Sequence, residues 1–154
     1  MASVFDVAAY ILAKAGPMPA MKLQKLVYYG QAWHLVWEED PLFNEHIEAW
    51  ANGPVAPALY RMHRLRWMLS KDEPLGGDPN KLTVLESETV DLVLESYGDK
   101  PAHWLSELTH RERPWREARE RAGLGDGERG NARITHQDMF EYYDGLTGVD
   151  AQEV

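Results

Sequence analysis

The sequence predicts a mainly α-helical protein, a single compact domain of about six or seven helices with a small extended or hairpin element near residues 41–54. Apolar residues recur at three- and four-residue steps over most of the chain, which is the period of a helix with one buried face. Glycine and proline pairs interrupt this pattern where helices stop or start. The length of 154 residues fits one domain, since a chain of this size buries roughly 70% of its unfolded surface.

Two helices are predicted at the N-terminal end. The segment from Ser3 to Ala15 has helical spacing, with Ser3 as N-cap and Gly16-Pro17 as the stop. The stretch AMKLQKLVYYGQAWHLVW then gives the longest and most aromatic helix, which Pro41 ends. Gly30 lies inside this helix, where glycine costs up to about 1 kcal/mol relative to alanine, so we expect another backbone to pass close to it.

The middle of the chain changes period. Residues 41–54 alternate loosely around Asn44-Glu45, which predicts a short hairpin or extended excursion. Gly53-Pro54 then redirects the chain into a helix over residues 57–69, because glycine permits unusual backbone angles and proline fixes φ. The buried side of that helix would carry Leu59, Met62, Leu65 and Leu69.

Further helices are expected in the second half. SETVDLVLESYG predicts one that ends at Gly98, and Pro101 and Pro114 can each begin a short helix. Thr135 is a candidate N-cap for the last helix, with Asp138 as the capping-box acid. Residues 149–154 are expected to form a frayed acidic tail after a domain over residues 1–148.

Charge and composition exclude several classes of protein. The formal net charge of −9 disfavours general binding to a phosphate backbone. The absence of cysteine excludes disulfides and thiolate chemistry. No long uncharged apolar run or basic leader is present, so we expect a cytoplasmic protein without membrane contact. Arginines gather in two places, residues 61–66 and 110–121, and two interpretations remain open: a local anion-binding patch, or ion pairs of the second group with Glu112, Glu117 and Glu120 along a solvated helix.

The residues show no enzyme signature. The six histidines are scattered over separate elements without metal-binding spacing, and the sequence contains no phosphate-binding loop or nucleophile elbow. We therefore expect no catalytic residue, metal or cofactor. The six tryptophans are mainly core residues in this interpretation, although Trp67 and Trp115 lie among arginines in a mixture that is typical of binding surfaces.

Three blocks of sequence resemble a known family. The blocks MKLQKLVYYGQAWHLVW, PLFNEHIEAWANGPVAPALYR and LSELTHRERPWREAR together resemble the Panacea domain, the antitoxin module of bacterial and phage toxin–antitoxin pairs. The likeness extends from about Phe5 to Leu146. It implies a helical, non-enzymatic protein that binds and neutralises a cognate toxin made from an adjacent gene. The family's motif residues fall on Lys22, Leu23, Gln24, Lys25, Leu26, Tyr28, Phe43, Ile47, Glu48, Ala49, Trp50, Gly53, Pro54, Val55, Tyr60, Leu105, Leu108, Thr109, His110, Pro114, Trp115 and Arg119.

The resemblance and the residue types together predict a candidate surface for a toxin, which the acidic charge suggests is basic. Two interpretations of Gly53-Pro54 remain open: it only sets the fold, or it forms part of this surface. A DNA-binding regulator, a small metal-dependent hydrolase and an adaptor for proteolysis are the alternative functions, and self-association is undetermined. The candidate surface comprises Lys22, Gln24, Trp50, Asn52, Gly53, Pro54, Tyr60, Arg64, Trp67, His110, Trp115 and Arg119.

Overall fold

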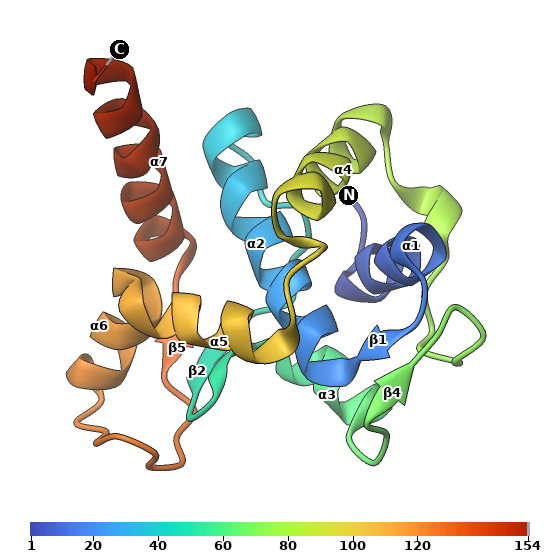
Figure 1. Ribbon diagram of the computed structural model, residues 1–154, viewed down its shortest axis with the longest axis horizontal. Coiled ribbons are helices and arrows are strands. Elements are labelled where there is room, and N and C mark those ends of the chain that lie inside the picture. The colour runs from blue at the N-terminus through green and yellow to red at the C-terminus, as the bar shows by residue number, and fades with distance from the viewer. Residues whose placement is uncertain (154) are drawn as a thin grey trace.

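A computed structural model describes residues 1–153, with side chains described for residues 1–147. The predicted fold class is confirmed: over this range the chain forms one mainly helical domain with seven α-helices and small antiparallel sheets. Figure 1 shows α2 in the centre, with α1 and α4 on one side and α5, α6 and α7 on the other. The helices are α1 (Val4–Ala15), α2 (Ala20–Glu38), α3 (Pro57–His63), α4 (Val84–Tyr97), α5 (Ala102–Arg111), α6 (Arg113–Arg121) and α7 (His136–Glu153), and a 3₁₀ turn spans Pro79–Lys81.

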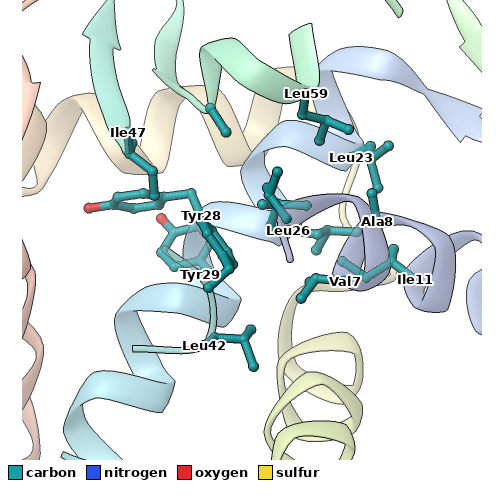
Figure 2. Close-up of a cluster of buried hydrophobic side chains, with 14 of the residues drawn as sticks. Val7, Ala8, Ile11, Leu23, Leu26, Tyr28, Tyr29, Leu42, Ile47 and Leu59 are labelled. Atoms are coloured by element: carbon teal, nitrogen blue, oxygen red, sulfur yellow. The ribbon is translucent and has the colours of Figure 1, made fainter. Parts of the chain in front are cut away.

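Helix α2 forms the centre of the core because most of its side chains are apolar and it packs against four other helices. Figure 2 shows Leu23 and Leu26 of α2 beside Val7 and Ile11 of α1, all fully buried. The predicted reason for Gly30 is wrong. A Cβ on Gly30 would lie 3.3 Å from the Leu42 side chain, so a side chain and not a backbone approaches it.

Five short strands form two antiparallel sheets. In the larger sheet β2 (Ile47–Trp50) pairs on one side with β3 (Gly53–Val55) and on the other with β5 (Arg133–Ile134). In the smaller sheet β1 (Met18–Pro19) pairs with β4 (Met68–Leu69). The expected hairpin in residues 41–54 is therefore present, but its turn lies at residues 51–52 and not at Asn44-Glu45.

Leu42 and Phe43, which we expected in the hairpin, belong to the core instead. Their backbone amides both donate to Oε1 of buried Gln31, at 2.7 Å and 3.4 Å. Gln31 also donates to the Phe43 carbonyl. This side chain on α2 replaces the strand partner that the segment would otherwise need.

The helix predicted over residues 57–69 is too long, because α3 ends at His63. Beyond it, Trp67 accepts a hydrogen bond from the Ala20 amide at 2.8 Å, and Met68 and Leu69 pair with β1. Met62 and Leu65 are consequently exposed and not buried as expected. Of the four residues assigned to the buried side, Leu59 and Leu69 are buried.

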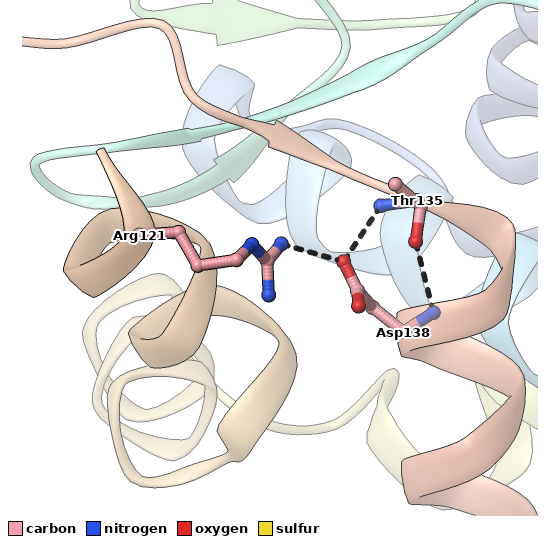
Figure 3. A network of polar contacts seen from close by, with 3 residues as sticks. All are labelled: Arg121, Thr135 and Asp138. Atoms are coloured by element: carbon pink, nitrogen blue, oxygen red, sulfur yellow. Dashed lines mark hydrogen bonds and ion pairs between the residues drawn. The ribbon is translucent and has the colours of Figure 1, made fainter.

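Capping residues define where the two longest helices of the second half, α4 and α7, begin. Helix α4 begins earlier than expected, at Val84, because Thr83 and Glu86 form a reciprocal capping box. Helix α7 has the capping box that we predicted: Asp138 N–H donates to Thr135 Oγ1 at 3.0 Å, and Thr135 N–H donates to Asp138 Oδ2 at 3.1 Å. Arg121 of α6 donates to the same carboxylate at 2.9 Å, which ties α6 to the start of α7 (Figure 3). Val154, in the predicted frayed tail 149–154, lies outside the described residues, and that fraying stays a prediction.

The expected ion pairs along residues 110–121 are only partly present. Arg113 and Glu117 approach to 3.9 Å on the surface. Glu112 is instead buried, and its Oε1 accepts hydrogen bonds from Tyr29 at 2.7 Å and Tyr143 at 2.8 Å. Burial raises the pKa of this carboxyl group, although the two tyrosine hydroxyls act in the opposite direction. Arg119 is also buried, so the segment is not simply a solvated helix.

Candidate functional site

The candidate site is the β2–β3 hairpin, which lies near the lower edge of the view in Figure 1, below α5 and next to α3. Gly53, its first residue after the turn, has φ +125°, which L side chains rarely adopt. A Cβ at this position would lie 2.4 Å from Lys25 Cε and 3.1 Å from Thr109 Oγ1. Glycine is therefore required here both by the backbone angle and by the close approach of α2 and α5.

Two side chains of α2 hold the outgoing strand of the hairpin. Lys25 Nζ donates to the Pro54 carbonyl at 2.9 Å. Gln24 Oε1 accepts from the Ala56 amide at 2.9 Å, and its Nε2 donates to the Ala56 carbonyl at 3.4 Å. Both side chains are buried, so these bonds satisfy backbone groups that water does not reach.

Three side chains from α5 and α6 hold the turn and the incoming strand. Trp115 Nε1 donates to the Trp50 carbonyl at 2.7 Å, and Arg119 Nη1 donates to the Ala49 carbonyl at 2.9 Å. Ser106 Oγ donates to the Asn52 carbonyl. The hairpin backbone is thus bound by side chains from three helices, which we call the anchoring side chains: Gln24, Lys25, Ser106, Trp115 and Arg119.

Arg119 also fixes the loop that precedes β5. Its Nη2 donates to the carbonyls of Gly125 and Glu128 at 3.0 Å and 2.6 Å. The guanidinium lies 5.2 Å from the centre of the Trp115 ring, and His110 stacks on that ring at 4.0 Å. This stack makes α5 and α6 one support for the hairpin.

Burial changes the protonation of the basic groups under the hairpin. It lowers the pKa of Lys25 from 10.5 to about 7, because a buried ammonium loses its hydration. Burial also lowers the pKa of His110, and the charges of Lys25 and Arg119 act in the same direction. Burial lowers the pKa of His63 as well. Its Nε2 lies 2.9 Å from Gln24 Nε2, and the neutral ring accepts a hydrogen bond from this amide.

The outer face of the hairpin borders a pocket of about 560 Å³. Trp50 and Tyr60 line it with their rings in an edge-to-face arrangement, 4.8 Å between centres. Trp50 Nε1 donates to Glu48 Oε1 at 2.8 Å, which fixes the indole and places a carboxylate in the pocket wall. Asn52 lines the mouth and is exposed. We call this feature the hairpin pocket.

A second exposed feature follows Tyr60 along the chain. Residues Arg61–Met68, which we call the arm, contain both Arg64 and Trp67 of the predicted surface. The Trp67 side chain is 76% exposed, and Leu65 beside it is 92% exposed. The arm contacts one anchoring side chain, because Nε2 of buried His63 lies 2.9 Å from Gln24 Nε2.

The structure brings together nine of the twelve predicted residues and separates three. Gln24, Trp50, Asn52, Gly53, Pro54, Tyr60, His110, Trp115 and Arg119 lie in or around the hairpin. Arg64 and Trp67 belong to the arm. Lys22 lies elsewhere, because its Nζ donates to the Gly98 carbonyl at 2.6 Å and so ties α2 to the end of α4. Whether any of these residues contacts a partner stays a prediction.

Several residues at the site escaped the prediction. Lys25 was a motif residue but not a candidate, although a lysine within the apolar stripe of a helix is itself a signal of a specific buried partner. Glu48 was likewise a motif residue but not a candidate. Ser106 was neither, because an isolated serine on a short amphipathic helix is usually solvated.

The histidines do not converge on one centre. His34 Nδ1 lies 2.8 Å from Thr89 Oγ1, His46 Nε2 lies 2.8 Å from Glu48, and His63 and His110 have the partners given above. Over the part of the chain that the structure describes, no three His, Asp or Glu side chains are grouped as metal ligands would be. None of the described helices has the length and apolar character needed to cross a bilayer.

Comparison with known proteins agrees with the resemblance. The family model described as "Antitoxin SocA-like, Panacea domain" matches residues 23–116, which is more than half of the chain. Antitoxin SocA of Caulobacter vibrioides (strain NA1000 / CB15N) is 42% identical over 59 residues, and this match covers 36% of the present chain and 31% of that relative. No solved structure gives a significant match. The matched segment contains the whole hairpin and every anchoring side chain except Arg119, and the chain therefore belongs to the family of SocA-like antitoxins with a Panacea domain.

Proposed function

We propose that this protein is an antitoxin that neutralises a cognate toxin, encoded by a neighbouring gene, by binding it directly. Membership of the antitoxin family supports a toxin as the partner. The observation that carries the proposal of direct binding is the rigid presentation of Trp50, Asn52 and Tyr60 around the hairpin pocket. In this proposal the protein acts by occupying the toxin's surface, without catalysis or a cofactor.

The anchored hairpin is suited to binding because its backbone already has a fixed conformation in the folded protein before a partner arrives. Side chains from three helices fix its backbone, so little conformational entropy is lost when a partner arrives. Tryptophan and tyrosine are enriched among the residues that dominate binding energy. The pocket volume of about 560 Å³ accommodates one or two side chains of a partner.

Electrostatics supports a basic toxin. The chain has a net charge of −9, and Glu48 lines the hairpin pocket together with Trp50 and Tyr60, although Arg129 also lines it. The carboxylate and the two aromatic rings suit a lysine or arginine side chain of a partner, which gains both ionic and cation–π attraction. Opposite net charges would also speed the encounter, so the association rate should fall steeply as salt is added. A rate that does not respond to salt would contradict this part of the proposal.

The experiment combines growth and binding. Cells that express the neighbouring gene are compared with and without this protein, and the two products are tested for co-purification. We expect toxicity that the wild-type chain relieves, together with a stable complex. Toxicity without relief or complex would refute the proposal, whereas tight binding of this chain alone to the promoter of its own operon would favour a transcriptional regulator.

A matched pair of variants tests the hairpin pocket in the same assay. Asn52→Lys places a cation at the mouth of the pocket and should abolish relief, because it repels a basic partner and fills the space. Asn44→Lys makes the same change at another exposed asparagine, away from this pocket, and should retain relief. Equal relief by both variants would exclude the hairpin pocket as the toxin contact.

A further inference from the structure

We infer that the arm, Arg61–Met68, is a second docking surface, and that it takes a segment of the partner protein that combines acidic and apolar side chains. The inference rests on the proposed function, since the partner is the cognate toxin. The hairpin pocket offers an acidic side chain to basic groups of the toxin, whereas the arm offers basic side chains to acidic groups of the toxin. The acidic segment can belong to a toxin that is basic overall.

The arm exposes an unusual number of large apolar side chains for a segment of eight residues. Leu65 is 92% exposed and Trp67 is 76% exposed, and Met62 and Met68 are each 42% exposed. Single exposed apolar residues are ordinary on protein surfaces. Here four large ones lie within eight residues of the chain, and a concentration of exposed apolar surface marks interaction sites.

The arm is anchored at both ends, so its shape is set before a partner binds. At one end α3 buries Leu59 and His63 against the core. At the other end Leu69 is buried, β4 pairs with β1, and the Trp67 carbonyl accepts from the Ala20 amide at 2.8 Å. A preformed apolar surface binds with a smaller entropy loss than a flexible one.

The charge of the arm defines the chemistry of its occupant. Arg61, Arg64 and Arg66 are exposed, and residues 61–68 contain no acidic side chain, although the chain as a whole carries −9. Arg66 forms an ion pair with Glu73, which shows that a carboxylate fits beside this surface. Within the described part of the chain, no carboxylate lies in ion-pair range of Arg61 or Arg64. Their guanidinium groups therefore remain available to carboxylates of a partner.

The surface fits a protein better than a nucleic acid or a membrane. A phosphate backbone and an anionic bilayer would both be repelled by the acidic remainder of the molecule. Met62, Leu65 and Met68 have no function in a phosphate contact, whereas such flexible apolar side chains are typical of protein interfaces. Charge complementarity and apolar content together indicate an acidic and apolar protein segment.

The arm continues from the hairpin pocket. Tyr60 lines the pocket and directly precedes Arg61. Met21 also lines the pocket and follows Ala20, whose amide binds the arm at Trp67. One partner can therefore contact both features, with basic side chains at the pocket and acidic side chains at the arm.

The test measures the affinity of the purified product of the neighbouring gene for matched pairs of variants. The arm variants are Arg61→Glu with Arg64→Glu, and Leu65→Ser with Trp67→Ser. The controls are Arg111→Glu with Arg116→Glu at exposed arginines of α5 and α6, and Leu85→Ser with Leu92→Ser on the exposed face of α4. Circular dichroism verifies that each variant is folded.

We expect each arm variant to weaken binding at least about tenfold, and each control to stay within about twofold of the wild type. Arm variants that bind within about twofold of the wild type would overturn the inference, while binding of the wild type itself would leave the proposed function standing. No binding by the wild type would refute both. Arm-dependent binding to duplex DNA, or to vesicles of phosphatidylcholine and phosphatidylglycerol, with an unchanged toxin complex would also overturn the inference.

Discussion

Lys25 should make the stability of this protein rise with pH in the weakly alkaline range. Its ammonium group is completely buried and donates to the Pro54 carbonyl at 2.9 Å. Burial lowers its pKa from 10.5 to about 7 in the folded protein. The folded state therefore releases this proton near neutrality, whereas the unfolded chain keeps it until about pH 10.5.

The sign and size of the effect follow from these two values. Because the folded pKa is the lower one, the contribution to stability is fully present above the unfolded pKa and is lost as pH falls through the folded pKa. Between about pH 7.5 and pH 9 the unfolded state holds almost one proton more than the folded state. Integration over that interval gives an increase of about 2 kcal/mol in the free energy of unfolding.

Urea unfolding of the wild type and of Lys25→Met between about pH 7.5 and pH 9 checks this prediction. Methionine has a similar volume and no proton to release, so the variant should lack the increase. The buried tyrosines, whose pKa values are raised, lower stability only as pH approaches 10, and they affect both proteins alike. A flat wild-type profile, or the same increase in Lys25→Met, would refute the assignment of a neutral buried lysine.

Two further predictions concern the hairpin. Gly53→Val should destabilise the fold by more than about 3 kcal/mol, because the side chain would be strained at φ +125° and would collide with Lys25. Thermal unfolding measures this loss of stability. A folded variant of normal stability that no longer binds the toxin would instead favour a contact role for the glycine. Trp115→Phe should lower the free energy of unfolding by about 1 to 2 kcal/mol, since an aromatic ring remains against His110 but the donor to the Trp50 carbonyl is lost. Urea unfolding checks this, provided that the dependence of the free energy on urea concentration is the same for both proteins. Unchanged stability would show that this hydrogen bond contributes nothing.

The helices could be predicted from the sequence because their signals are local. Ser3 and Thr135 act as N-caps within one turn of the residues they bind, and the apolar period of α1 and α2 needs no knowledge of the rest of the chain. The strand at Met68–Leu69 could not be predicted in this way. Its partner Met18–Pro19 lies far away in sequence, and the spacing of Leu65 and Leu69 fits a helix equally well.

The composition of the site was partly predictable, but its arrangement was not. The resemblance identified Gln24, Trp115 and Arg119, yet we expected them on a surface and the structure shows them bound to backbone groups of the hairpin. Every residue offers the same carbonyl as an acceptor, so no pattern in the sequence reveals which one a buried donor will bind. Trp67 is exposed, as its arginine neighbours suggested, but it does not lie in the helix predicted over residues 57–69, because α3 ends at His63.

The way in which the hairpin is held separates two properties that are usually linked. All five anchoring side chains bind main-chain groups of the hairpin or of Ala56 directly after it, so the loop keeps its shape whichever side chains it carries outward. Substitutions at Asn52 can then alter recognition with little effect on folding. A lineage that must follow a changing toxin could exchange these outward groups repeatedly on one unchanged scaffold.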